Sequence, residues 1–465
     1  MALGRKPIEI VNDGKHQLLS KAEHWDRIYL KEVAKVQNGY AFSSDYFTKS
    51  DGMPLIRIRD IDSYTTVDKF SGKYNEDFVV KKGDILIGMD GDFKTARWKG
   101  ENALLNQRVC RIIPNSKNYN DKFLVFCLQP FLDAIHAETS SVTVKHISSK
   151  TIEEIPLPLP PKKEQDEIVS KIEELFSELD KGIENLRLAQ QQLKTYRQSV
   201  LKWAFEGKLT EVWRKEQKSL PDSNKLLKQI QAEKEKLSET TGKKLKSLTG
   251  ITEEERTNLP ELPDKWTWVK LGDNAFVTKL AGFEFTKYVK YKEEGEVPVI
   301  RAQNVSKTSF IPRNFLYVDR EIMEKLPRSR VYGGEILMVF VGAGLGNVGI
   351  VPEKTEYFLG PNVAKIALEK QFNNKYIFHF LTSQLGFANV TGMSKATAQG
   401  SISMGNIREV SVPLISIEEQ KKIVREIESR LSVADKMEES ITQSLQQAEA
   451  LRQSILKKAF EGKLI

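Results

Sequence analysis

The chain contains an internal repeat that limits what it can fold into. Residues 155–210 align without a gap on residues 410–465, at a constant offset of 255, with 25 identities in 56 positions. The run AFEGKL at 204–209 recurs letter for letter at 459–464. Repetition at this level indicates one structural element built twice. The chain must therefore hold two copies of this element, each preceded by a longer segment.

The repeated element is predicted to be a long helix. Residues 162–205 contain no proline, apolar residues recur every seven positions, and Gly207 follows as a stop signal. A heptad seam needs a partner, and the other copy in the same chain is the nearest one, so the two helices are expected to pack against each other. The alternative is two helices that each pack only on their own domain. The predicted seam residues are Ile168, Ile172, Leu175, Leu179, Leu186, Leu193, Tyr196, Val200, Ile427, Ile441, Leu451 and Ile455.

The segments before the two helices, here called the first and second heads, are also related. GYAF at 39–42 resembles GFEF at 282–285, and PLIRIRDI at 54–61 resembles PVIRAQNV at 298–305. The offset grows from 241 to 255 along the chain, so order is kept while loops change length. Short β-branched runs between turn residues predict an α+β fold with curved antiparallel sheets in each head. Strands are expected at 55–58, 85–87, 109–113, 299–300, 336–341 and 363–368, and helices at 122–135 and 374–387.

These patterns predict a division of the chain into six parts. Between the heads, the charged connector is expected to be solvated and to hold one short amphipathic helix through Leu226, Ile230 and Leu237. The parts are an N-terminal segment (1–24), the first head (25–161), the first helix (162–209), the connector (210–265), the second head (266–415) and the second helix (416–465).

Composition argues against several other classes of protein. The net charge is +8. On a chain of 465 residues this charge favours polyanionic partners only slightly. Cys110 and Cys127 lie in apolar runs, as buried thiols of a reducing compartment do. The five histidines have no zinc-ligand spacing, and no apolar run reaches the roughly 20 residues that span a bilayer. A cytoplasmic protein with no metal and no membrane partner is expected.

No catalytic motif stands out in the sequence. GLGNVG at 344–349 fits the dinucleotide fingerprint, but Pro352 prevents a helix from starting behind it, so a hairpin turn is predicted. There is no Gly-Lys-Ser/Thr phosphate loop and no Asn/Asp-Pro-Pro-aromatic run of the amino-methyltransferase kind. The chain is expected to be a binding protein, without a catalytic site or cofactor of its own.

Taken together, these features resemble the specificity subunit of Type I restriction–modification enzymes. The resemblance covers nearly the whole chain and rests on PLPP at 158–161 with Glu164 and Gln165, the heptad helices and the repeated FEGKL. It implies two target-recognition domains, each reading half of a bipartite double-stranded DNA target. It also implies that the two long helices form an antiparallel coiled coil. This coiled coil would dock two modification (methyltransferase) subunits and, through them, restriction (ATP-dependent translocase–nuclease) subunits. S-adenosylmethionine, ATP and magnesium would belong to those partners.

Polar residues at matching points of the two heads are candidate DNA contacts. Bases are read by Arg, Lys, amides and acids, while phosphates attract Lys and Arg. The contrast of Arg59-Asp60 with Gln303-Asn304 at one aligned site suits heads that read different half-sites. The first-head candidates are Arg57, Arg59, Asp60, Lys94, Arg97, Gln107, Arg108, Lys145 and His146. The second-head candidates are Arg301, Gln303, Asn304, Asn347, Asn362, Lys395 and Gln399.

Two other functions fit the same sequence. One is a coiled-coil scaffold whose heads bind proteins, which would lack the steep salt dependence of DNA binding. The other is a nuclease or methyltransferase acting alone, which would modify or cleave DNA as the pure chain when given magnesium and S-adenosylmethionine.

Overall fold

The computed structural model describes residues 5–139, 145–217, 219–241, 249–353, 356–392 and 400–465. The chain forms two compact units: unit 1 is Met1–Leu188 with Ile441–Ile465, and unit 2 is Ala189–Ser440. The boundary between the units falls inside both long helices, α5 (Lys162–Phe205) and α14 (Ile417–Phe460). Each unit therefore combines one head with a part of each helix.

Among its described residues, the head of unit 1 holds three sheets. The main one is fully antiparallel, as predicted, with the order β2 (Ala34–Asn38), β10 (Val109–Pro114), β7 (Ile85–Gly88), β8 (Thr95–Arg97). A second has the order β3 (Phe47–Thr48), β5 (Lys69–Phe70), β4 (Met53–Ile56), β9 (Ala103–Leu105), β6 (Val79–Val80). Its β4–β9 pair is parallel, which the antiparallel prediction missed. The smallest pairs β1 (Asp26–Tyr29) with β11 (Pro156–Leu159).

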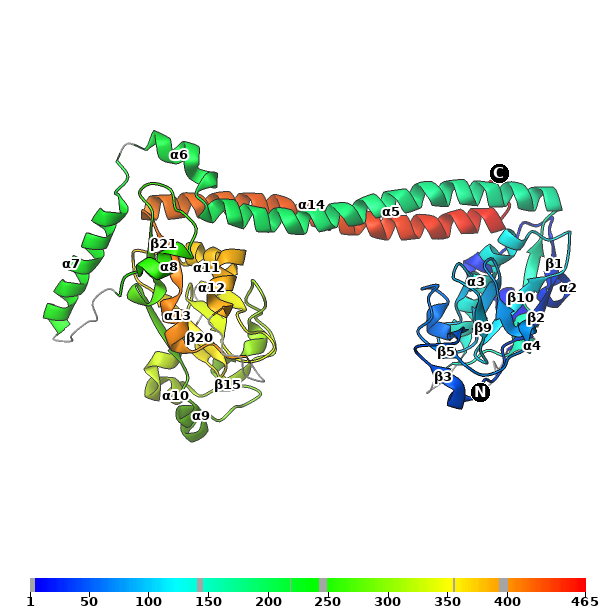
Figure 1. The fold of residues 1–465 in the computed structure, drawn as a ribbon, viewed down its shortest axis with the longest axis horizontal. Helices are drawn as coiled ribbons and strands as arrows, with labels where there is room; N and C mark the ends of the chain where they lie inside the picture. Colours follow the sequence, from blue (N-terminus) through cyan, green and yellow to red (C-terminus); the bar gives the residue numbers. More distant parts are fainter. Residues whose placement is uncertain (1–4, 140–144, 218, 242–248, 354–355, 393–399) are drawn as a thin grey trace. The chain divides into compact units, whose positions relative to one another are not determined.

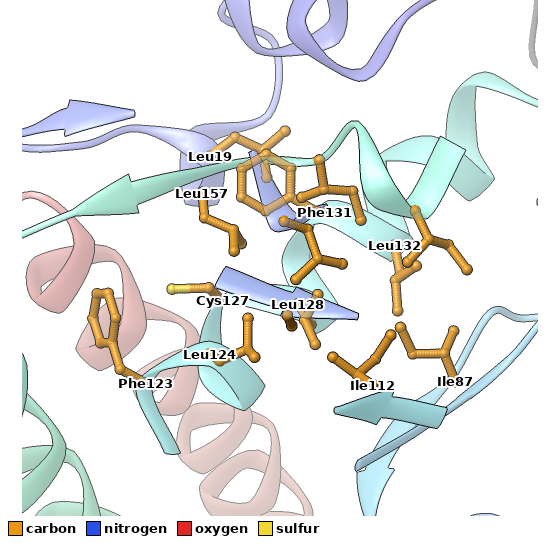
Figure 2. Packing of buried hydrophobic residues seen from close by; sticks show 14 of the residues in the cluster. Leu19, Ile87, Ile112, Phe123, Leu124, Cys127, Leu128, Phe131, Leu132 and Leu157 are labelled. Atoms are coloured by element: carbon orange, nitrogen blue, oxygen red, sulfur yellow. The ribbon is translucent and has the colours of Figure 1, made fainter. Parts of the chain in front are cut away.

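One helix organises the core of unit 1. It is α3 (Asp121–Glu138), and Asn120 caps it because its Oδ1 accepts the N–H groups of Lys122 and Phe123, at 2.7 and 3.0 Å. Its apolar face packs against strands and the chain before β1 (Figure 2). Cys127 on this face and Cys110 on β10 are free, buried thiols, as predicted, and burial raises the pKa of Cys110 to about 12.

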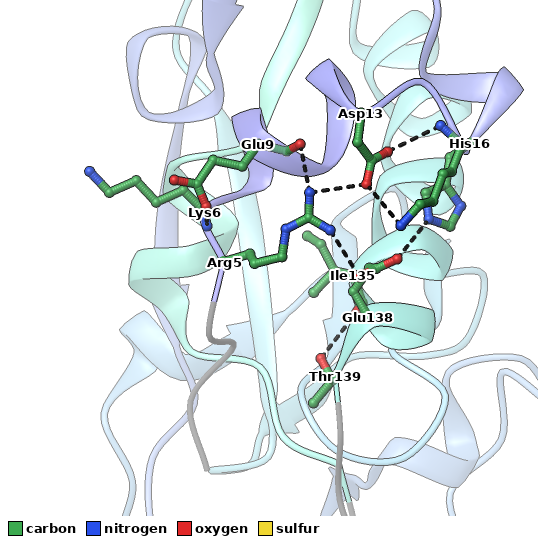
Figure 3. A network of polar contacts seen from close by, with 9 residues as sticks. Arg5, Lys6, Glu9, Asp13, His16, Ile135, Glu138 and Thr139 are labelled. Atoms are coloured by element: carbon green, nitrogen blue, oxygen red, sulfur yellow. Dashed lines mark hydrogen bonds and ion pairs between the residues drawn. The ribbon is translucent and has the colours of Figure 1, made fainter.

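The N-terminal segment packs on the end of α3 and belongs to the fold of unit 1. Helix α1 (Pro7–Asn12) buries Ile10, and the guanidinium of Arg5 donates to Glu138 Oε2 at 3.1 Å and to Asp13 Oδ2 at 3.0 Å (Figure 3). The backbone N–H of Lys15, with Arg5, lowers the pKa of Asp13. These polar contacts fix the segment beside the first head.

The head of unit 2 repeats the plan of unit 1. The main sheet has the order β13 (Ala275–Lys279), β20 (Val363–Leu368), β17 (Ile336–Val339), β18 (Val348–Ile350). The second has the order β15 (Leu316–Val318), β14 (Val297–Ile300), β19 (Glu356–Leu359), β16 (Arg330–Tyr332), again with one parallel pair, β14–β19. A two-stranded sheet joins β12 (Thr267–Lys270) to β21 (Ser411–Leu414). The glycine-rich stretch after β17 is the turn of the β17–β18 hairpin, as predicted.

The single helix predicted at 374–387 is wrong, because two helices occupy this stretch. They are α11 (Asn374–Thr382) and α12 (Gln384–Thr391), and between them Ser383 is extended, with φ −68° and ψ 159°. Its Oγ accepts the N–H of Gly386 at 3.1 Å and caps α12. A Cβ on Gly386 would lie 2.0 Å from the carbonyl oxygen of Phe380, so this close turn requires glycine.

The connector is more helical than predicted. It contains α6 (Glu211–Glu216), α7 (Ser223–Thr241) and α8 (Glu253–Thr257). The predicted amphipathic helix exists as α7, whose Ile230 is buried in the core of unit 2 with Leu226 beside it; the side chain of Leu237 lies outside the described residues. The prediction that the connector lysines are solvated is wrong for Lys234, because its ammonium donates to the backbone oxygen of Asp273.

Within each unit, α5 and α14 lie side by side and run antiparallel, as predicted (Figure 1). Arg197 binds Asp435 in unit 2, and Arg452 binds Asp180 in unit 1. These pairs are equivalent in the repeat: Arg452 lies 255 positions after Arg197, and Asp180 lies 255 positions before Asp435. The arginine and the acid have therefore exchanged helices. In each unit the pair joins a late position of one helix to an earlier position of the other, as antiparallel helices do.

Most of the predicted seam is buried or half-buried, with one error. Leu451 is 51% exposed. On this turn of α14 the guanidinium of Arg452 lies 4.5 Å from the ring centroid of Phe176, so Arg452 faces α5. An α-helix drifts by about 20° per heptad relative to a 3.5-residue repeat, which moves position 451 off the seam. The buried seam residues are Ile168, Ile172, Val200, Ile427 and Ile455, and the half-buried ones are Leu175, Leu179, Leu186, Leu193, Tyr196 and Ile441.

Each unit joins its head to a helix by the same contacts. Trp25 Nε1 donates to Glu164 Oε2 at 3.1 Å in unit 1, and Trp266 Nε1 donates to Glu419 Oε2 at 3.0 Å in unit 2. The two carboxylates are repeat equivalents. In unit 2 an arginine completes the joint: Arg214 Nε donates to Glu419 Oε1 at 2.7 Å, and its guanidinium lies over the Trp266 ring.

The buried His379 on α11 makes the stability of unit 2 depend on pH. Burial lowers the pKa of His379 to about 4, although Glu428 acts in the opposite direction. The unfolded chain, with a histidine pKa of about 6.5, takes up a proton before the folded unit does, so stability is lost as pH falls from about 6.5 towards 4. The wild-type loss in free energy of unfolding between pH 7 and pH 4.5 should exceed that of His379→Gln by about 2–3 kcal/mol. Equal losses in denaturant titrations would contradict this.

Candidate nucleic-acid interface

Arg57 and Arg59 meet at a carboxylate that the sequence analysis did not select. They follow β4, at the short 3₁₀ helix Ile58–Asp60. Arg57 Nε lies 2.5 Å and Arg59 Nη2 2.6 Å from Asp68 Oδ2. Two guanidinium groups thus share one acid, and Arg59 remains 57% exposed. Arg59 Nε also lies 3.7 Å from Asp60 Oδ1, so two guanidinium groups face two carboxyl groups here.

Asp60 and Asn304 are structural caps, which corrects their selection as DNA contacts. Asp60 is 3% exposed, its Oδ2 accepts the N–H of Arg57 at 2.8 Å, and burial raises its pKa. Asn304, at the aligned position, is fully buried, and its Oδ1 accepts the N–H of Arg301 at 3.0 Å. These side chains are buried because each satisfies the backbone at the start of a 3₁₀ helix. Neither can reach a base.

The partners of Arg301 and Gln303 differ from those in the first head. Arg301 Nη2 and Gln303 Nε2 both donate to the backbone oxygen of Asn314, at 2.9 and 3.2 Å. Asn314 has a positive φ of 55°, a conformation that asparagine tolerates better than most residues. At this aligned place one head therefore offers two arginines around an acid, and the other an arginine and an amide.

A second group in the first head forms around Asp90. Arg108 Nε lies 3.4 Å from Asp90 Oδ2, and His146 Nδ1 lies 2.5 Å from Asp90 Oδ1. Neighbouring Lys145 donates to the backbone oxygen of His136 at 2.6 Å. Gln107 is exposed beside Arg108. The structure thus brings together predicted residues that lie about 40 positions apart in sequence.

Lys94 and Arg97 do not join this group. Lys94 pairs with Asp62, which raises its pKa, and Arg97 Nη1 donates to the backbone oxygen of Gly83 at 3.2 Å. The acids that hold these cations are Asp62, Asp68 and Asp90. Sequence reasoning missed them because base and phosphate recognition points first to positive and amide side chains. A search for acids in loops flanked by the selected cations would have included them.

The remaining second-head candidates are spread over two turns. Asn347 is half-buried, and its Nδ2 donates to the backbone oxygen of Val305 at 3.3 Å. Asn362 is exposed before β20, with a positive φ of 64°. Lys395 and Gln399 lie outside the described residues.

Over the parts of the chain that the structure describes, other kinds of site are not found. No cluster of three or more His, Cys, Asp or Glu side chains is placed to hold a metal ion. No described helix is long and apolar enough to cross a membrane.

Comparison with known proteins identifies relatives along the whole chain. The sequence profile described as "Type I restriction modification DNA specificity domain" matches residues 22–187 and 263–447. The EcoBI Type I restriction enzyme specificity subunit of Escherichia coli is 35% identical over 458 residues, which cover 98% of this chain and 90% of the relative. The MjaVIII specificity subunit of Methanocaldococcus jannaschii is 21% identical, with 85% of this chain and 82% of that protein covered.

Two solved structures share the fold. A chain from a structure titled for complex assembly and conformational transition of the type I R-M system superposes with a TM-score of 0.64, at 16% identity, covering 95% of this chain and 99% of that one. The HsdS subunit from Thermoanaerobacter tengcongensis superposes with a TM-score of 0.51, also at 16% identity, covering 95% and 98%.

Proposed function

Because this chain belongs to the family of Type I restriction–modification DNA specificity subunits, we propose that its two heads each read one half of a bipartite double-stranded DNA target. The observation that carries this is the duplicated head: one backbone plan is used twice, with different polar groups at the same places. Two unlike readers on one chain are what recognition of an asymmetric, two-part sequence requires.

The partners follow from the repeated helices. Two copies of one helical surface, related by the reciprocal Arg–Asp pairs, suit two copies of one partner, the modification (methyltransferase) subunit. The ATP-dependent restriction subunits join through those partners, and catalysis and its cofactors belong to the partners rather than to this chain. The complex works in the cytoplasm. Along its sequence, this chain has the six parts predicted above.

The proposed DNA contacts are the exposed or half-buried polar groups of both heads. Asp62 pairs with Lys94 and Asp68 pairs with Arg59, and both cations are proposed to contact DNA. A guanidinium group held in one orientation suits a bidentate contact to guanine or phosphate. The proposed contacts are Arg57, Arg59, Lys94, Arg97, Gln107, Arg108, Lys145, His146, Arg301, Gln303, Asn347 and Asn362, with Lys395 and Gln399 retained from the sequence.

Two measurements test this function. Co-expression with the cognate methyltransferase subunit should yield methylated adenines at one bipartite sequence, found by sequencing the modified genome. Duplex binding by the complex should weaken steeply as salt rises, because cations on the protein displace counterions from phosphates. A scaffold whose heads bind proteins would give neither result.

Arg59→Ala should relax sequence choice at one half-site only. If Arg59 makes a bidentate contact to a base, its loss costs about 1–3 kcal/mol for the correct base at that position. Binding to a panel of duplexes with single substitutions measures this. Gln303→Ala, at the aligned place in the second head, is the matched variant and should affect the other half-site. Equal weakening on every duplex would instead make Arg59 a phosphate contact.

A further inference from the structure

Three chain segments of the first head converge beside the end of β7. The backbone N–H of Met89 donates to the oxygen of Arg108 at 2.9 Å, and the N–H of Ile147 donates to the oxygen of Met89 at 2.9 Å. Asp90 and His146 form an isolated antiparallel β-bridge. The loop after β7, the turn before β10 and the chain near residue 146 are therefore fixed to one another through the backbone.

The second head contains the same backbone frame. The N–H of Phe340 donates to the oxygen of Asn362 at 3.0 Å, the N–H of Ile402 donates to the oxygen of Phe340 at 3.0 Å, and Val341 and Ser401 form the isolated bridge. The flanking pairings agree, since Gly88 faces Val109 in one head as Val339 faces Val363 in the other. Asp90, Arg108 and His146 thus correspond in space to Val341, Asn362 and Ser401.

The side chains on this shared frame have different chemistry. In the first head they form the charged Asp90 group, with Arg108 57% and His146 44% exposed. In the second head they are an aliphatic group, an amide and a hydroxyl, and Asn362 is exposed. Because the second head keeps the frame without any of these charges, the charges are not needed to build it. Exposed ion pairs also add little stability. A role at the surface accounts for them better.

Each set matches one kind of base pair in the major groove. Arginine binds guanine O6 and N7 through two donors, and an acid accepts from the N4 amino group of cytosine. The ion pair to Asp90 engages Arg108 through Nε, on the side edge of the guanidinium, whereas guanine would be met by the end edge that Nη1 and Nη2 form. Asparagine binds adenine N6 and N7, and an aliphatic group packs on the thymine methyl.

We propose that this three-residue frame is a specificity-determining position of both heads, reading a G·C pair through Asp90, Arg108 and His146 and an A·T pair through Val341, Asn362 and Ser401. The proposal rests on the DNA-reading function above and adds to it the residues and the base pair. Arg108 and Asn362 contact the purine, and Asp90 both orients Arg108 and faces the cytosine. Val341 takes the place of Asp90 beside the thymine.

The test exchanges the two sets in the full chain. The variant Asp90→Val/Arg108→Asn/His146→Ser is expressed with the methyltransferase subunit, and the methylated motif is read by sequencing. We expect one G·C position in one half-site to become A·T while the other half-site stays unchanged. Arg108→Lys keeps the charge but loses the two-donor geometry, and should lower discrimination at that G·C position roughly 5- to 150-fold. Lys117→Ala, which removes an exposed charge elsewhere on the same head, is the control and should leave the motif as it is.

The outcomes separate this proposal from the general function. A wild-type complex that methylates no bipartite sequence would overturn the DNA-reading function itself. If the triple variant and Arg108→Lys both still methylate the wild-type motif, the base-reading role of the frame is overturned, but the DNA-reading function is not. An equal loss of methylation on all sequences would have the same meaning. If the triple variant fails to fold, as judged by circular dichroism, Arg108→Lys alone decides.

Discussion

Replacing Glu419 by alanine is expected to lower the free energy of unfolding of unit 2 by about 3–5 kcal/mol. The side chain of Glu419 is 3% exposed and that of Arg214 12% exposed, and removing one partner leaves the other as a buried, uncompensated charge. Thr210 Oγ1 also donates to Glu419 Oε1, at 2.8 Å, so a hydroxyl loses its acceptor too. Hydrogen exchange at β12 and the first turns of α14 in the full chain measures the change.

The repeat supplies a matched variant for this prediction. Glu164 occupies the equivalent position in unit 1, where it accepts from Trp25 but is 21% exposed, and the imidazole Nε2 of His24 lies 3.8 Å away. Glu164→Ala should therefore cost less, about 1.5–3 kcal/mol, the effect of losing one hydrogen bond to a charged group. Equal losses in the two units would show that Arg214 contributes nothing at the joint.

Replacing Phe460 by alanine should destabilise unit 1 by about 3–5 kcal/mol, because it removes a buried ring from the contact between a helix end and a head. Phe460 is 2% exposed, and its ring centroid lies 6.3 Å from that of Phe123 on α3. The end of α14 should then detach while α5 stays on its own part of the head. Denaturant titration, with hydrogen exchange over residues 455–464, measures both effects.

The same substitution can be made on the other helix. Phe205 is the repeat equivalent, and its ring lies 5.4 Å from Tyr376 and 5.1 Å from Phe380 in unit 2. Phe205→Ala should give a loss of the same size in unit 2 only, whereas Trp203→Ala, at a side chain 39% exposed, should change little. If Phe460→Ala leaves exchange at the end of α14 unchanged, the helix end is held by other contacts.

These joints also explain how the duplication builds the molecule. The end of each long helix packs on the head of the other copy: Phe205 of α5 on the second head, Phe460 of α14 on the first. The start of each helix stays on its own head through Glu164 and Glu419. Each head is thus completed by both helices, which is why the compact units cut across the sequence division into heads and helices.

The sequence by itself determined the features that follow from local or repeated patterns. The heptads predicted two long helices that pair, because the spacing of apolar side chains along one helix decides which face is buried. The antiparallel direction of that pairing was implied by the family resemblance. The hairpin at 344–349 followed from Pro352, since proline removes a helix at that place whatever surrounds it. The family resemblance also rested on these local motifs.

Only the tertiary structure decided which distant groups meet. The parallel pairs β4–β9 and β14–β19, the acids around the predicted cations and the burial of Asp60 all depend on segments far apart in the chain, whose approach leaves no periodic signal. The exposure of Leu451 arises because a helix has 3.6 rather than 3.5 residues per turn, so its seam depends on the actual supercoil. The frame shared by Asp90 and Val341 is held by backbone bonds, and these do not depend on side-chain identity.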